Sequence, residues 1–154
     1  MKRTLTASIC ALAICAGIIT IAADGASNND KEIRDVVELY FKGAATSEAH
    51  YFEKAFDVAN AHMKYVSKDQ SGKEVMRIVP ITDAIKGWTS RPPEKSWGKI
   101  ISIDTVDDKM AVAKVEMLYR GTIYVDLLSL YKINGEWKIV NKVFVSRGRV
   151  PDSQ

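Results

Sequence analysis

The stretch that decides the fold is Thr122-Ile-Tyr-Val-Asp-Leu-Leu-Ser-Leu-Tyr-Lys-Ile133, followed by Asn134-Gly135 and then by Glu136-Trp-Lys-Ile-Val-Asn-Lys-Val-Phe-Val145. Both long runs are rich in β-branched and aromatic residues, which favour strands. An Asn-Gly pair between two such runs is the strongest local signal for a two-residue β-hairpin. The stretch therefore predicts two long antiparallel strands, whose register determines which side chains share a face.

A regular two-residue turn sets the pairing of these two strands. It places Leu128 opposite Asn141 and Asp126 opposite Val143, and directly opposed residues share one face of a sheet. One face then carries Tyr124, Asp126, Leu128, Leu130, Trp137, Ile139, Asn141, Val143 and Val145. The other face carries Val125, Leu127, Ser129, Tyr131, Lys138, Val140, Lys142 and Phe144. We expect the first face, which is the more apolar one, to point toward the core.

A second turn signal, Arg120-Gly121, predicts a further hairpin with a strand at residues 110–119. The same two-residue geometry places Val115 opposite Asp126. Both hairpins then put their apolar residues on one shared face, and this agreement supports the register. A β-bulge in either hairpin would reverse the face of every residue beyond it.

Asp126 and Asn141 are polar exceptions on the predicted apolar face, diagonally placed within reach of each other. A buried carboxylate needs partners, because burial of an unpaired charge is costly. Two interpretations remain open. Asp126 accepts structural hydrogen bonds from Asn141 or from a helix N-terminus, or it serves as a polar anchor or general base in an apolar pocket.

The rest of the chain carries signals for three helices and three further strands. Apolar residues spaced by three and four after Asp30 predict an amphipathic helix that Asp30 caps and that ends or kinks near Gly43. Shorter helices are expected at 49–55 and 83–88, and strands at 61–66, 74–79 and 99–106. Helices followed by a meander of antiparallel strands predict an α+β domain with helices on one face of a curved sheet.

The N-terminus has the pattern of an export signal. Lys2 and Arg3 precede an apolar run at residues 5–21, and small residues follow. We expect a signal peptide at residues 1–23, with a retained membrane anchor as the alternative. Cleavage would leave no stable membrane anchor and a periplasmic or secreted protein. A disordered start at 24–29, a domain at 30–147 and a tail at 148–154 complete the predicted organisation.

Composition restricts the chemistry of the mature chain. The 154 residues suggest one domain, and a net charge of +3 offers no electrostatic argument for nucleic-acid binding. Cys10 and Cys15 both lie in the predicted signal, so the mature chain would have no disulfide and no thiol nucleophile. Only two histidines occur, His50 and His62, and neither has ligand-spaced carboxylates around it. We therefore expect no metal site and no cofactor.

Several segments together resemble the lumazine-binding branch of the nuclear transport factor 2-like superfamily, whose relatives include SnoaL-like, cystatin-like and ketosteroid-isomerase-like proteins. They are Val37-Glu-Leu-Tyr-Phe-Lys-Gly43 in the first helix, the strand segments 101–104, 111–115 and 124–130, and Asn134-Gly-Glu-Trp-Lys-Ile-Val-Asn-Lys-Val-Phe144. The last segment is the most specific. The resemblance covers roughly residues 30–145.

The resemblance implies a cone, in which a strongly bent, largely antiparallel sheet wraps around three N-terminal helices and leaves a pocket at its wide end. It also implies that members are often dimers through the open sheet face, and that catalytic members place a carboxylate or a histidine in the pocket. The segment Thr46-Ser-Glu-Ala-His50 departs from the family pattern, because it lacks the Gly-Asp turn of many relatives.

The expected cone and its pocket suggest candidate site residues. Asp126 and Asn141 are candidate ligand anchors, and Tyr40, Trp88 and Tyr119 either line the pocket or belong to the core. His50 precedes two aromatic residues near the expected pocket mouth, so it is a second candidate for a general base, or else a surface residue.

Three functions remain open at this point. The first is an exported, non-catalytic domain that holds a small apolar or aromatic ligand in the cone. The second is an isomerase, dehydratase or cyclase with Asp126 or His50 as general base. The third is an interaction protein of the cell envelope whose cone is filled by its own side chains. The half-apolar second sheet face predicts a homodimer in addition.

Overall fold

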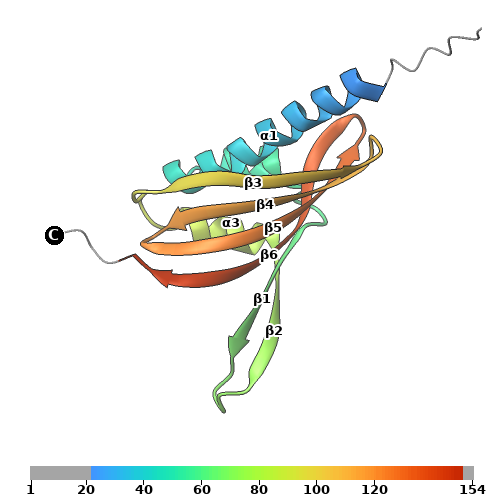
Figure 1. Ribbon diagram of the computed structural model, residues 1–154. Helices are drawn as coiled ribbons and strands as arrows, with labels where there is room; N and C mark the ends of the chain where they lie inside the picture. The colour runs from blue at the N-terminus through green and yellow to red at the C-terminus, as the bar shows by residue number, and fades with distance from the viewer. Residues whose placement is uncertain (1–21, 151–154) are drawn as a thin grey trace, which may run out of the picture.

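A six-stranded sheet with the strand order β2-β1-β6-β5-β4-β3 curls around three helices (Figure 1). The computed structural model describes residues 22–150 of the chain. All neighbouring strands are antiparallel except β1 and β6, which pair in parallel over three residues. The structure thereby confirms the predicted α+β class with a curved sheet and three helices.

The elements follow one another as predicted, helices mainly before strands. The helices are α1 (Ala22–Thr46), α2 (Ala49–Ala55) and α3 (Ile81–Thr89). The strands are β1 (His62–Lys68), β2 (Glu74–Pro80), β3 (Trp97–Val106), β4 (Met110–Tyr119), β5 (Thr122–Ile133) and β6 (Glu136–Arg149). The hairpin of β1 and β2 projects away from the rest of the sheet (Figure 1).

Both predicted hairpin turns are present. Asn134 and Gly135 have φ angles of 52° and 86°, and Arg120 and Gly121 have 50° and 73°. Positive φ at both central residues is the hallmark of the type I′ turn, whose twist matches that of the flanking strands. The β4–β5 register is confirmed over its whole length, with Val115 opposite Asp126.

The β5–β6 register is correct only near its turn. Pairing follows the prediction as far as Leu130 opposite Ile139, and then shifts by one residue, so that Ser129 lies opposite Asn141. Val140 is the extra residue of a β-bulge. Because one inserted residue reverses the later alternation, the faces predicted for the rest of β6 are wrong.

The bulge exchanges the inward and outward residues of β6. Lys142, expected on the outer face, lies opposite Leu128 and is 4% exposed. Phe144 lies opposite Asp126, in place of the predicted Val143. Val145, expected to point inward, is 63% exposed.

Helix α1 is longer than its sequence pattern suggested. It begins at Ala22, upstream of the expected cap Asp30, and residues 24–29, expected as a disordered start, lie in its first turns. It also continues past Gly43, where we expected an end or a kink. A Cβ atom at Gly43 would lie 2.9 Å from the ring of Phe52, so glycine there allows α2 to pack closely against α1.

The core lies between the helices and the concave face of the sheet. It joins α1 to α2, α3 and the central strands through large buried side chains that include Ile33, Val37, Phe52, Phe56, Ile81, Leu128, Leu130 and Ile139. Within residues 22–150 no helix combines the length and the hydropathy that crossing a membrane requires. The predicted signal peptide falls almost entirely on residues 1–21, outside the described part of the chain.

Candidate functional site

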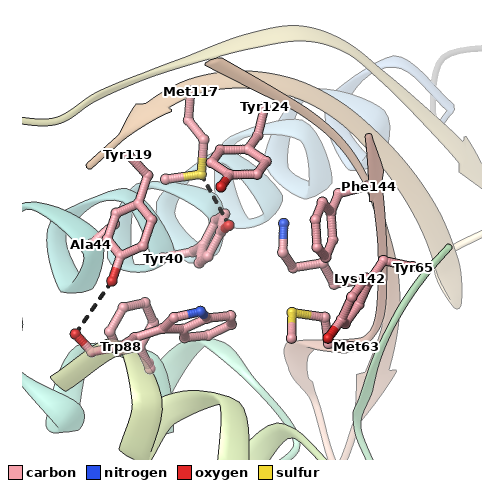
Figure 2. A pocket seen from close by; sticks show the side chains of 11 residues that line it. Tyr40, Ala44, Met63, Tyr65, Trp88, Met117, Tyr119, Tyr124, Lys142 and Phe144 are labelled. Atoms are coloured by element: carbon pink, nitrogen blue, oxygen red, sulfur yellow. Dashed lines mark hydrogen bonds between the residues drawn. The ribbon is translucent and has the colours of Figure 1, made fainter. Parts of the chain in front are cut away.

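A cavity of about 190 Å³ opens between the helices and the concave sheet face (Figure 2). Residues from all three helices and from β1, β4, β5 and β6 surround it. They are Tyr40, Ala44, Phe52, Met63, Tyr65, Trp88, Met117, Tyr119, Tyr124, Lys142 and Phe144. Seven of these eleven residues are aromatic, and Lys142 supplies the one charged group among them. The cone is therefore not filled by its own side chains.

Lys142 forms an ion pair with Asp126 at the base of the cavity. Asp126 is 0% exposed and Lys142 is 4% exposed, so both charges are removed from water. The bulge at Val140 creates this pair, because it turns Lys142 onto the face that Asp126 occupies. Asp126 does not line the cavity itself, and Lys142 is the residue of the ion pair that reaches the cavity wall.

Tyr40 completes the polar group from helix α1. Its hydroxyl donates a hydrogen bond of 2.8 Å to Oδ2 of Asp126, and its oxygen lies 3.0 Å from the sulfur of Met117. Burial raises the pKa of Tyr40 well above its ordinary value, and the negative charge of Asp126 raises it further. Tyr40 therefore stays protonated and acts as a fixed donor to the carboxylate.

The Lys142 ammonium lies among aromatic rings (Figure 2). Its nitrogen is 4.6 Å from the ring centre of Phe144 and 5.5 Å from that of Tyr40. Burial lowers the pKa of Lys142, and the Asp126 carboxylate opposes that effect without cancelling it. An ammonium has three N–H donors, and Asp126 uses one of them. Lys142 can therefore offer donors to a molecule in the cavity.

Trp88 and Tyr119 form the opposite end of the wall. The Trp88 ring centre lies 4.9 Å from that of Phe52, and the Tyr119 hydroxyl donates to the Trp88 backbone oxygen at 3.3 Å (Figure 2). Arg120 binds the loop that follows α3, through Glu94 at 2.8 Å and the backbone oxygen of Pro92 at 3.2 Å. These two contacts of Arg120 hold the loop at residues 91–95 beside the Trp88 end of the cavity.

The structure brings together some of the predicted site residues. Tyr40, Trp88 and Tyr119, for which a place in the pocket or in the core was open, all line the cavity. Asp126 lies behind them, and its contacts with Tyr40 and Lys142 separate it from the cavity. A direct general-base role for Asp126 is therefore disfavoured by its position.

Asn141 and His50 lie away from the cavity. Asn141 pairs with Ser129 across β5 and β6, on the face opposite to Asp126, because of the bulge. His50 is half exposed, contacts the carboxylate of Glu48 at 3.4 Å and packs against Tyr51 with ring centres 3.9 Å apart. The predicted pair of Asp126 with Asn141 is wrong, and Lys142 replaces Asn141 as the partner of Asp126.

Metal binding finds no support in the described residues. Within 22–150, no group of three or more histidine, cysteine, aspartate or glutamate side chains is arranged to hold an ion. The polar cluster at the cavity consists of Tyr40, Asp126 and Lys142, and its cation is the lysine itself.

A family model described as "Putative lumazine-binding" matches residues 28–145, which is most of the chain. The chain belongs to this family. The match includes every residue that lines the cavity. The comparison with curated proteins finds no match.

Solved structures similar to this lumazine-binding-family chain are described as NTF2-like proteins of unknown function. One, from Shewanella baltica OS155, has 21% identity over 79% of this chain and 95% of that chain, with a TM-score of 0.68. One from Silicibacter pomeroyi DSS-3 has 19% identity over 79% and 98%, with a TM-score of 0.67. A third, from Methylobacillus flagellatus KT, has 26% identity over 84% and 98%, with a TM-score of 0.68. They show that the chain has the NTF2-like fold.

Sequence reasoning missed Lys142 and Phe144 as pocket residues of this family member. Regular alternation assigned both to the outer face, and the bulge reverses that assignment. A local signal exists in Val-Asn-Lys-Val, where two polar residues stand side by side in a strand that otherwise alternates. Adjacent polar residues on a half-buried strand are compatible with a bulge, in which two neighbours oppose one residue. Met63 and Tyr65 were also missed, because β1 carries only a weak strand pattern.

Proposed function

We propose that this domain binds a small, uncharged, mainly aromatic molecule in the cone, through a hydrogen bond from Lys142 to an acceptor such as a carbonyl oxygen. One observation carries the proposal, namely that Lys142 is the only charged residue among those that line a mainly aromatic cavity. Pockets for small molecules combine an apolar wall with a few polar groups that fix orientation. The family's description, which names lumazine, agrees with a cyclic ligand that carries carbonyl groups.

The size of the cavity limits the ligand. In another protein, an apolar cavity of about 150 Å³ holds one benzene molecule. A cavity of about 190 Å³ therefore accommodates one aromatic ring with a short polar substituent. A fused two-ring molecule such as lumazine would be at the upper limit of this space.

The charge of the site limits the ligand further. Lys142 and Asp126 neutralise each other, so an anionic ligand would leave one uncompensated negative charge in a buried, weakly polar site. An uncharged ligand with a carbonyl acceptor uses the free donors of Lys142 without that cost. We therefore favour neutral aromatic amides, ketones and aldehydes over aromatic acids.

Calorimetric titration with benzamide and with benzoate tests this proposal. We expect benzamide to bind and benzoate to bind more weakly, because only benzoate adds a charge. Ala44→Leu fills the cavity and should abolish binding, since Ala44 is buried in the wall. Ala45→Leu is the matched control, because its neighbour Ala45 is exposed on the same helix. Equal benzamide binding by the two variants would contradict a ligand in this cavity.

We also propose that the domain is exported, on the strength of the charged start and the apolar run at residues 2–21. N-terminal sequencing of the protein from its native host is the test. Cleavage near Ala23 supports export by a signal peptide, and an intact N-terminus in the cytoplasm contradicts it.

We further propose a homodimer through the outer face of the sheet. Four large apolar side chains on this face are exposed by 40–63%, and they are Val112, Leu127, Tyr131 and Val145. Exposed apolar clusters of this kind mark interaction sites, and a two-fold axis lets one patch cover itself.

A further inference from the structure

Lys142 is a buried amine that faces a cavity and has a carboxylate directly behind it. Among the cavity-lining residues it is the one side chain able to act as a strong nucleophile. We propose that Lys142 forms a covalent imine with an aromatic aldehyde held in the cavity, and that Asp126 carries the proton for this reaction. The inference rests on the proposed function, because the aldehyde occupies the same cavity and its oxygen takes the place of the acceptor.

The surroundings of Lys142 favour its free amine over its ammonium form more strongly than an exposed position would. Removal from water disfavours the ammonium, and burial accordingly lowers the pKa of Lys142. Asp126 contacts Lys142 through Oδ2, so it can accept the proton that the amine must lose. Oδ1 of Asp126 is buried and has no hydrogen-bond partner among the described residues, which leaves the carboxyl group a free oxygen.

The reaction balances without an added oxidant or reductant. Lys142 passes one proton to Asp126, and its nitrogen lone pair then forms a bond to the aldehyde carbon while the C=O π electrons move to oxygen. A proton moves from nitrogen to that oxygen and gives a neutral carbinolamine. Asp126 returns its proton to the Lys142 nitrogen, the nitrogen passes a proton to the hydroxyl group, and the nitrogen lone pair then expels water as the C–O bond breaks. The products are a protonated imine on Lys142 and one water molecule.

The site keeps its charge throughout this sequence. An ammonium is present at the start and a protonated imine at the end, and each pairs with the ionised Asp126. The rings of Phe144 and Tyr40 flank the same nitrogen at 4.6 Å and 5.5 Å. Aromatic faces stabilise a neighbouring cation, so they favour the imine in its protonated form.

Reductive trapping with benzaldehyde tests the proposal. The folded protein is mixed with benzaldehyde and cyanoborohydride, and peptide mapping by mass spectrometry follows the addition of benzyl groups to each lysine over time. Lys138 is the internal comparison, because it lies on the same strand and its side chain is 27% exposed. Binding beside the amine makes the reaction effectively intramolecular, so we expect Lys142 to react at least about tenfold faster than Lys138.

Two variants and one competitor sharpen the test. Lys142→Arg keeps a cation beside Asp126 but cannot form an imine, so the fast label should disappear. Asp126→Asn keeps the shape of the carboxyl group but removes the group that carries the proton for the loss of water. Labelling of Lys142 should therefore slow, even though loss of the carboxylate lowers the pKa of Lys142 further and leaves more of it as the free amine. Circular dichroism must show that both variants are folded. Benzamide, which occupies the cavity without reacting, should protect Lys142 and leave Lys138 unaffected.

The outcomes separate this proposal from the proposed function. If benzamide binds but Lys142 is labelled no faster than Lys138, the imine proposal fails and the binding function stands. If benzamide does not bind, the proposed function fails, and the imine proposal, which rests on it, fails with it. Fast labelling of Lys142 that benzamide does not slow would place the reaction outside the cavity and overturn the inference.

Discussion

At the ion pair of Asp126 and Lys142, two charges are held out of water beside an aromatic cavity. Desolvation of two charges costs several kcal/mol, and such a pair contributes little to net stability compared with apolar residues of similar volume. The pair is therefore better explained by what it presents to the cavity than by the stability of the fold. Removal of one partner still leaves an unpaired buried charge, which is strongly unfavourable.

Lys142→Met should lower the free energy of unfolding by about 3–5 kcal/mol, because it leaves Asp126 buried without its cation. The double change Lys142→Met with Asp126→Leu should recover most of that loss. Urea unfolding of the single and double variants measures both. Lys138→Met on the same strand is the control and should cost about 1 kcal/mol or less, since its ion pair with Glu136 is partly exposed. Strictly additive losses would contradict the pairing.

Tyr40 makes the stability of the folded protein depend on pH in the alkaline range. Its pKa is raised well above 10.0 in the folded protein, chiefly by burial, so the unfolded chain loses this proton at a pH where the folded protein keeps it. The stability that Tyr40 contributes is thus complete below pH 10.0 and is lost as pH rises through the folded pKa.

Absorbance of ionised tyrosine tests this assignment. Near pH 10, the folded wild-type protein and the folded Tyr40→Phe variant should show the same increase in absorbance, because Tyr40 does not ionise in that range. After unfolding in urea, the wild-type protein should show the larger increase. A difference already present in the folded proteins would show that Tyr40 is not shielded.

At the scale of the elements, the bulge in β6 determines which residues line the site. Lys142 and Phe144 face inward only because Val140 is an extra residue between Ile139 and Asn141. Bulges bend a strand and increase its twist, which suits a sheet that must curl around helices. The curvature and the pocket lining therefore share one local cause.

Deletion of Val140 tests the bulge. A regular ladder would then join Ile139 directly to the segment that begins at Asn141, and Lys142 would keep its inward face. We expect a folded protein that loses about 1–3 kcal/mol of unfolding free energy, because strand curvature is reduced. Deletion of Val143, in the regular part of the ladder, should be more harmful, because it turns every later side chain over. Equal losses in urea unfolding would contradict the assignment of Val140 as the inserted residue.

Sequence patterns predicted the elements better than the faces of the last strand. Turn chemistry at Arg120-Gly121 and Asn134-Gly135 located both hairpins, and the β4–β5 register followed without error. The end or kink expected at Gly43 is not an end of the helix, because a glycine that allows close packing has the same local signal as a helix end. The bulge depends on curvature set by contacts far along the chain, so local alternation could not reveal the partner of Asp126.

At the scale of the molecule, the concave and convex faces of the sheet differ in their surroundings. The concave face holds the core and the cavity, while the convex face exposes the apolar patch of Val112, Leu127, Tyr131 and Val145. A dimer through the convex face would cover that patch without blocking the cavity. Ligand binding and self-association should therefore be separable.

Leu127→Lys should convert the proposed dimer into a monomer. Leu127 is 42% exposed on the outer face, so a charge there adds repulsion across a two-fold axis without entering the core. Light scattering after size-exclusion chromatography measures the mass of wild type and variant, and benzamide titration of the monomer checks that the cavity is intact. A wild-type protein that is already monomeric at high concentration would contradict the dimer.

The most direct measurement is a crystal structure of the wild-type protein soaked with benzamide at a saturating concentration. We predict one benzamide ring among Trp88, Tyr119 and Phe144, with its carbonyl oxygen within hydrogen-bonding distance of Nζ of Lys142. An empty cavity, or a ring bound elsewhere while the cavity stays unoccupied, would contradict the claim that Lys142 anchors a small aromatic ligand in this cone.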